Sequence, residues 1–210
     1  MIAVVDYGMG NLRSVAKALE RVGADVRVTD DAATVERAAG VVLPGVGAFA
    51  RCMDNLKGAG LEGAVRAAAD SGKPFLGICV GMQILFDESD EFGRVEGLGI
   101  LPGAVRRFDA AASGGDALKI PHMGWNQVHQ QASSPLFDGI RDDERFYFVH
   151  SYYVETDRAD IVAATADYGV RFVASARREN LMATQFHPEK SQAVGLAVLA
   201  NFCRLVAGEV

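Results

Sequence analysis

Residues 74–81 read Pro-Phe-Leu-Gly-Ile-Cys-Val-Gly, an apolar run that ends at a cysteine with a glycine two positions away on either side. We predict a strand that turns sharply into a helix, because Gly77 and Gly81 lack the bulk that would keep neighbouring backbone away. Cys79 would then stand at a helix N-terminus, where unpaired N–H groups and the helix dipole favour its thiolate. The alternative for this position is a buried, unreactive cysteine.

The first half of the chain alternates short apolar runs with helical stretches. The pattern predicts strands at 2–5, 26–28, 41–43 and 75–78. It also predicts one helix that begins near residue 11 and a second helix over residues 61–69. Asn11 is available as the N-cap of the first helix. This alternation is typical of a parallel sheet with crossover helices.

From Gly97 onward the pattern changes to strands joined by turns, which favours antiparallel or mixed pairing. The expected strands are 99–108, 119–129, 146–154, 161–165, 172–176 and 181–185. A helix from Ser191 should return to cover the sheet, and residues 109–116 should form a mobile tip. We expect an α/β fold in which residues 1–210 make a single domain.

Composition limits the function classes. Of the 210 residues, 50% are hydrophobic, and the net charge of −6 with scattered basic residues argues against nucleic acid as a partner. No apolar run reaches the roughly 18 residues that span a bilayer, and no export signal is evident, so we expect a cytoplasmic location without membrane contact. Cys52, Cys79 and Cys203 have no CxxC spacing, which suggests one reactive and two buried thiols. We expect no metal and no cofactor.

Two further motifs complement Cys79. His187-Pro188-Glu189 supplies a base and a carboxylate that could orient it, although alone this would be a strand end with a solvated acid. Residues 41–47 predict a strand that ends in a glycine-rich turn, which could otherwise be a plain loop. Attack on a carbonyl needs N–H donors for the oxyanion, and Val80 with Gly45 and Val46 fits this need.

Other segments carry weaker signals. The opening residues 6–11 suggest dinucleotide binding, but Arg13 occupies the third glycine position of that motif. His150, within a predicted strand, is by itself an ordinary core or surface histidine. His122 and His129 have no metal-ligand partners at usable spacing and are interpreted as non-catalytic.

At these motifs the sequence resembles the class I glutamine amidotransferases that use a cysteine-histidine-glutamate triad. PGVG, GICVGMQ and FHPE follow in the family's order, and the segments at 6–12, 122–126 and 147–152 resemble the glutaminase subunits of imidazole glycerol phosphate synthase. The resemblance implies a flavodoxin-like α/β fold, a mixed and largely parallel sheet flanked by helices with antiparallel strands in the C-terminal half. It also implies hydrolysis of glutamine to glutamate through a Cys79 thioester, with His187 as acid and base.

The resemblance extends to binding residues and a partner. It implies that glutamine is held by Gly47, Gln83, Glu91, Ser151 and Tyr152. The ammonia would pass to a separate (β/α)₈-barrel cyclase of histidine biosynthesis in a heterodimer. The positions that match the interface or channel mouth are Met9, Asn11, Trp125, Tyr147 and Lys190. For Glu91 the alternative is a solvated acidic loop that includes Asp87, Glu88 and Asp90. For Trp125 and Tyr147 it is core packing.

Three other functions compete with this one. The first is a glutaminase subunit of another synthase, in the pyridoxal phosphate, anthranilate or purine pathway. The second is a general cysteine hydrolase or peptidase on the same sheet. The third is a non-enzymatic binding protein, which the complete triad disfavours.

Overall fold

Parallel strands from the first half of the chain form one end of the main sheet. The structure, a computed structural model, describes residues 1–111 and 118–209. These strands are β1 (Ile2–Val5), β2 (Val26–Thr29), β3 (Gly40–Gly45) and β4 (Phe75–Cys79), in the order β2-β1-β3-β4. Every residue of β1, β3 and β4 is buried, as in strands whose two faces are both covered. The predicted parallel half is confirmed.

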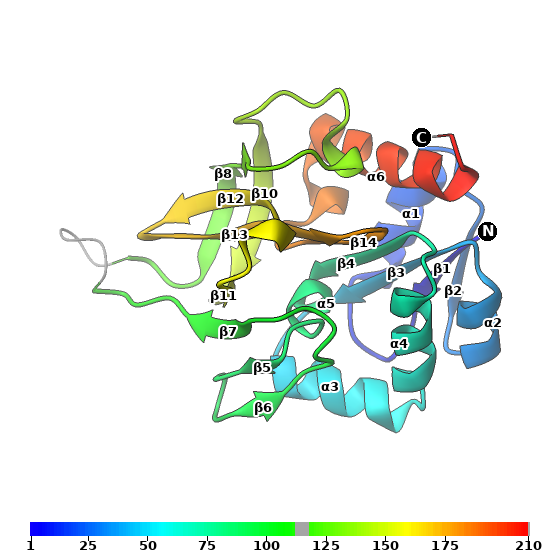
Figure 1. The fold of residues 1–210 in the computed structure, drawn as a ribbon, viewed down its shortest axis with the longest axis horizontal. Coiled ribbons are helices and arrows are strands. Elements are labelled where there is room, and N and C mark those ends of the chain that lie inside the picture. The colour runs from blue at the N-terminus through cyan, green and yellow to red at the C-terminus, as the bar shows by residue number, and fades with distance from the viewer. Residues whose placement is uncertain (112–117, 210) are drawn as a thin grey trace.

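Helices cover both faces of this sheet. They are α1 (Leu12–Arg21), α2 (Ala32–Arg37), α3 (Phe49–Gly58), α4 (Glu62–Asp70), α5 (Val80–Gln83) and α6 (Gln192–Ala207). Figure 1 shows α1 and α6 on one face and α3 and α4 on the other. The sequence patterns did not predict α2 or α3, the first because it is only six residues long. Asn11 is the N-cap residue of α1 as predicted, and its carbonyl accepts a hydrogen bond from the backbone nitrogen of Val15, but its side chain makes no capping hydrogen bond.

The part of the chain that follows β4 extends the sheet with mixed pairing. Its strands are β14 (Leu181–Thr184), β13 (Val170–Arg178), β11 (Tyr152–Glu155), β7 (Ala104–Arg107), β5 (Glu88–Ser89), β6 (Val95–Glu96), β12 (Val162–Tyr168) and β9 (His129–Gln130). β14 is parallel to β4 and antiparallel to β13, and it therefore joins the two halves. Within the described residues the sheet has twelve strands, and its mixed pairing confirms the expected fold.

A separate pair of strands, β8 (His122–Gln127) and β10 (Arg145–His150), makes a two-stranded antiparallel sheet. The single strand expected at 146–154 is broken at Ser151, because β10 pairs with β8 whereas β11 pairs in the main sheet. The strand expected at 119–129 is likewise divided between β8 and β9, and the one at 99–108 is limited to β7. Short 3₁₀ turns occupy Pro135–Phe137, Ala159–Ile161 and Pro188–Lys190. Of the expected tip at 109–116, residues 112–116 lie outside the described residues.

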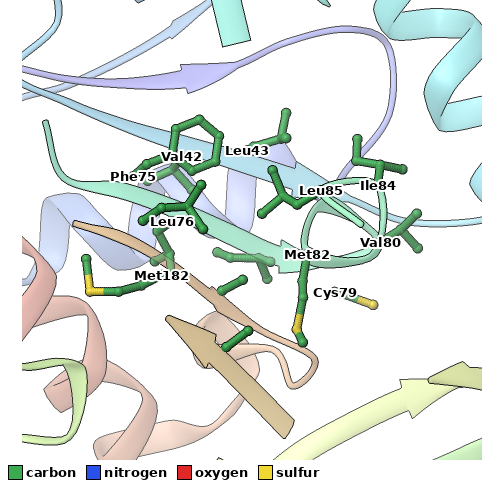
Figure 2. Packing of buried hydrophobic residues seen from close by; sticks show 14 of the residues in the cluster. Val42, Leu43, Phe75, Leu76, Cys79, Val80, Met82, Ile84, Leu85 and Met182 are labelled. Carbon is green, nitrogen blue, oxygen red and sulfur yellow. The ribbon is translucent and has the colours of Figure 1, made fainter. Parts of the chain in front are cut away.

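Buried apolar side chains cluster where β3, β4 and β14 adjoin. Figure 2 shows Val42, Leu76 and Met182 packed around these strands, and Cys79 at the edge of the cluster where β4 gives way to α5. Cys52 is buried as expected, but Cys203 is partly exposed on α6, which corrects the expectation of two buried thiols. In the part of the chain that the structure describes, every helix is too short or too polar to cross a membrane.

Candidate active site

Cys79 occupies a strained turn. Its φ of 56° and ψ of −113° fall in a region that residues with a side chain rarely adopt, at a cost of about 1–3 kcal/mol. The backbone after Cys79 passes very close to β3, and the glycine at position 81 allows this approach, because a Cβ on Gly81 would collide with the carbonyl oxygen of Leu43. Cys79 is therefore presented at the junction of β4 and α5, as the sequence predicted.

His187 and Glu189 form a buried pair beside this cysteine. Nδ1 of His187 lies 2.8 Å from Oε1 of Glu189, and their side chains are only 2% and 1% exposed. Nε2 of His187 has no hydrogen-bond partner among the described residues, which leaves it free to exchange a proton. Burial lowers the pKa of His187, but the Cys79 thiolate and the Glu189 carboxylate raise it more, to about 10. The arrangement can hold an ion pair of thiolate and imidazolium.

The glycine-rich turn lies directly against the cysteine. Gly45 is in register with Cys79 in the parallel pair of β3 and β4. Val46 and Gly47 line the cavity at Cys79, as does Val80, whose N–H follows the nucleophile. Gly45 itself is buried behind this wall, where a Cβ would lie 2.5 Å from the backbone nitrogen of Gly81. The three predicted oxyanion residues are thus brought together.

A cavity of about 370 Å³ collects the predicted substrate residues around Cys79 and His187. Gly47, Gln83, Glu91, Ser151 and Tyr152 all line it, and Lys190 lies at its wall. Asp87, Glu88 and Asp90, the neighbours of Glu91 in the sequence, are not among the lining residues. This size suits a small polar ligand.

Glu91 has a defined environment. Its Oε2 accepts a hydrogen bond of 2.6 Å from the backbone nitrogen of Phe49, the first residue of α3. The positive end of the helix therefore offsets the cost of a carboxylate that is only 9% exposed. A carboxylate held in this way in a cavity can pair with a cationic group of a ligand. The alternative of a solvated loop is excluded for Glu91 by its burial.

The residues predicted for an interface lie outside the cavity, apart from Lys190. Trp125 is 42% exposed, and its ring packs edge-on against the ring of Tyr147, with 6.1 Å between the two ring centroids. Core packing is thereby excluded for Trp125. Tyr147 is half-buried, and its carbonyl accepts a hydrogen bond of 2.9 Å from the backbone nitrogen of His187. Met9 and Asn11 are half-buried in the loop that follows β1.

Gln185 was missed by the sequence patterns. Its Nε2 lies 3.7 Å from Sγ of Cys79, and its Oε1 accepts a hydrogen bond of 3.0 Å from Nε2 of Gln83. Gln83 donates also to the carbonyl of Tyr152 at 2.9 Å. The side chain of Gln185 is fully buried. No signal in the sequence marks this residue, because Gln185 lies in a bend after β14 and its contacts depend on how the fold brings α5 beside it.

His150 is the second missed residue. It lines the cavity, and its Nδ1 donates to the same Tyr152 carbonyl at 2.8 Å. Its role is to hold this carbonyl. Among residues 1–111 and 118–209, no group of three or more His, Cys, Asp or Glu side chains could hold a metal ion.

Comparison with known proteins identifies the class. The pattern of the class-I glutamine amidotransferases matches residues 3–205, and the chain belongs to this family. It is 57% identical over 203 residues to imidazole glycerol phosphate synthase subunit HisH of Syntrophotalea carbinolica, covering 96% of this chain and 98% of that protein. It is also 57% identical over 206 residues to subunit HisH of Aromatoleum aromaticum, with 96% of each chain covered. These relatives confirm the glutaminase subunit that the sequence motifs predicted.

Solved structures agree on the fold. A structure described as a glutamine amidotransferase superposes with a TM-score of 0.74 at 18% identity, over 99% of this chain and 100% of that one. The glutaminase domain of CTPS from Trypanosoma brucei superposes with a TM-score of 0.69 at 18% identity, over 99% of this chain and 93% of that one. At such identities the likeness concerns the fold alone.

Proposed function

We propose that Cys79, His187 and Glu189 hydrolyse glutamine and that the chain passes the ammonia to a separate cyclase subunit of imidazole glycerol phosphate synthase. The observation that carries this proposal is the buried His187–Glu189 bond of 2.8 Å next to a cysteine on a strained turn, all around one small cavity. The carboxylate fixes the ring so that Nε2 faces the reaction.

The chemistry follows from these positions. The Cys79 thiolate attacks the side-chain amide carbon of glutamine, and the oxyanion that forms is stabilised by the N–H groups of Val80 and of the Gly45–Val46 turn. His187 gives its proton to the leaving nitrogen, so that ammonia departs and a glutamyl thioester remains. A water molecule then loses a proton to His187 and attacks the thioester, which releases glutamate and restores the thiolate.

Substrate recognition uses the polar residues of the cavity. The ammonium group of glutamine pairs with Glu91, and Gly47, Ser151 and Tyr152 complete the walls. Both protons of the Gln83 amide are used by Tyr152 and Gln185, which leaves the Oε1 atom of Gln83 as its free group. Gln83 would therefore accept a hydrogen bond from the substrate rather than donate one.

The partner would be a (β/α)₈-barrel cyclase that forms a heterodimer with this chain and consumes the ammonia. Met9, Asn11, Trp125, Tyr147 and Lys190 would form the contact or the channel mouth. The exposure of Trp125 and the position of Lys190 at the cavity support this proposal. Residues 1–210 would act as a single amidotransferase domain, supported by the family match over residues 3–205. As a biosynthetic enzyme subunit, the protein would work in the cytoplasm.

Glutamate release tests the proposal. The purified chain is assayed with glutamine alone, then with the candidate cyclase, and then with the cyclase and its phosphorylated ribulosyl nucleotide. We expect strong stimulation only when both are present. Cys79→Ala should abolish release without loss of the fold, because a methyl group cannot attack. Glutamate release by Cys79→Ala would refute the proposed nucleophile. If glutamate release by the wild-type chain is not stimulated by this cyclase but is stimulated by another synthase, the proposed partner is wrong.

A further inference from the structure

Two buried side chains hold the carbonyl groups on either side of the Gly45–Val46 peptide. Tyr7, two residues after the end of β1, donates its hydroxyl proton to the carbonyl oxygen of Pro44 at 2.7 Å. Cys52, on α3, donates its thiol to the carbonyl oxygen of Val46 at 3.6 Å. Tyr7 is 3% exposed and Cys52 is fully buried. These donors come from different elements and converge on one turn.

The two bonds leave one peptide unit between them. The Pro44 carbonyl belongs to the peptide before Gly45, and the Val46 carbonyl belongs to the peptide after Val46. When both carbonyls are held, the Gly45–Val46 peptide plane can still rotate about the Cα atoms of Gly45 and Val46 without breaking either hydrogen bond. The space is otherwise closed, because a Cβ on Gly45 would lie 2.9 Å from the Tyr7 hydroxyl. The donors thus restrict the movement of the turn to this peptide.

Both groups keep the protons that they donate. Burial raises the pKa of Tyr7 well above its usual value, and the neighbouring Cys52 and Cys79 raise it further. Burial also raises the pKa of Cys52 to about 11, although the neighbouring Tyr7 hydroxyl opposes this shift. At neutral pH the pair therefore consists of a hydroxyl and a thiol. A buried thiol that keeps its proton is a poor nucleophile, so we do not expect Cys52 to react as Cys79 does.

We propose that Tyr7 and Cys52 are positioning residues that set the geometry of the oxyanion turn by holding the carbonyls of Pro44 and Val46. The inference rests on the proposed role of Gly45 and Val46 as part of the oxyanion site. Neither Tyr7 nor Cys52 lines the cavity, so neither would touch the substrate. Their effect would fall on the transition state, where charge develops on the oxygen, and not on the binding of glutamine.

Steady-state kinetics of the complex with the cyclase and its nucleotide provide the test. Tyr7→Phe and Cys52→Ala each remove one donor with little change in volume. We expect kcat for glutamate release to fall about tenfold to 100-fold, because a small misplacement of catalytic groups has effects of this size. KM should stay within about twofold. Cys52→Ser, which keeps a donor, should recover most of the activity, and Cys203→Ala on α6 is the matched control.

A second measurement separates the turn from general damage to the fold. Glutamate γ-semialdehyde adds to a thiolate to give a tetrahedral adduct with an oxyanion, whereas glutamate has no such adduct. We expect Tyr7→Phe and Cys52→Ala to weaken binding of the semialdehyde in proportion to kcat and to leave glutamate binding unchanged. If both variants keep the wild-type kcat and semialdehyde affinity, the inference is overturned. If the wild-type complex releases no glutamate, the proposed function fails and the inference fails with it.

Discussion

Nδ1 of His122 donates a hydrogen bond of 2.9 Å to Nε2 of His150, and the neighbours of the pair fix this direction. Nδ1 of His150 lies 2.8 Å from the carbonyl of Tyr152, which only accepts, so Nδ1 carries the proton and Nε2 accepts. At the other end, Asn126 donates to Nε2 of His122 at 3.3 Å. The series of bonds continues from Tyr152 through Gln83 and Gln185 to Sγ of Cys79. A half-buried amide on β8 is therefore connected to the nucleophile.

Acid should destabilise the protein through this pair. Burial lowers the pKa of His122 from 6.5 to about 4 and that of His150 from 6.5 to about 3. Because the unfolded chain takes up these protons first, the stabilising contribution is complete above pH 6.5 and is lost as the pH falls toward 4 for His122 and toward 3 for His150. Each histidine can contribute up to about 1.4 kcal/mol per pH unit. We expect urea unfolding of His150→Gln to show a shallower acid slope. Parallel curves for variant and wild type would contradict the prediction.

Gln185 should control the reactivity of Cys79. In Gln185→Glu the carboxylate can still accept from Gln83, but a negative charge replaces the N–H that points at the sulfur. We expect alkylation of Cys79 by iodoacetamide at pH 7 to slow about tenfold, because an anion nearby disfavours the thiolate. Mass spectrometry assigns the modified residue. Gln127→Glu, on the exposed side of β8, adds the same charge elsewhere and should react at the wild-type rate. Equal rates for all three proteins would exclude this role for Gln185.

Glu91→Gln should impair binding of glutamine and not its hydrolysis. Glutamine at this position can still accept the bond from Phe49, so α3 stays capped, but the negative charge is lost. We expect KM to rise about tenfold to 100-fold with little change in kcat, as for a lost charged hydrogen bond. Asp90→Asn removes a neighbouring charge outside the cavity and should leave KM unchanged. A larger KM effect at Asp90 than at Glu91 would reassign the ammonium partner.

The charge of His187 should depend on Cys79. Its pKa of about 10 lies above the ordinary 6.5 although burial lowers it, and the thiolate is the first cause that raises it. Charged His187 therefore stabilises the fold fully below pH 6.5, and this contribution is lost as the pH rises through 10. We expect Cys79→Ala to lower the pKa of His187, as followed by NMR of its ring. An unchanged titration in the variant would show that the two groups are not coupled.

The sequence predicted those parts of the molecule that depend on local pattern. The alternation of strands and helices and the elbow at Cys79 follow from spacing and glycine positions, whereas the residues that line the cavity were predicted from the family resemblance. The sequence could not predict where strands are interrupted. The alternating pattern continues through Ser151, and the strand ends there only because β10 pairs with β8 whereas β11 pairs in the main sheet. Gln185 and Cys52 also lacked a signal of their own, because their function depends on which atoms the fold brings beside them. Patterns identify the reacting groups more readily than the groups that hold them.

The pairing of β8 with β10 determines two surfaces at once. Trp125 lies opposite Tyr147 on the exposed side of the ribbon, and His122 lies opposite His150 on the buried side. A slip of one residue would turn each side chain to the other side, since strand residues alternate. Such a misfolded subunit would lose the buried histidine pair, of which His150 lines the cavity, together with its outward aromatic pair. Because His150 holds the Tyr152 carbonyl, a chain assembled in the wrong register would also lose the series of hydrogen bonds between β10 and the sulfur of Cys79.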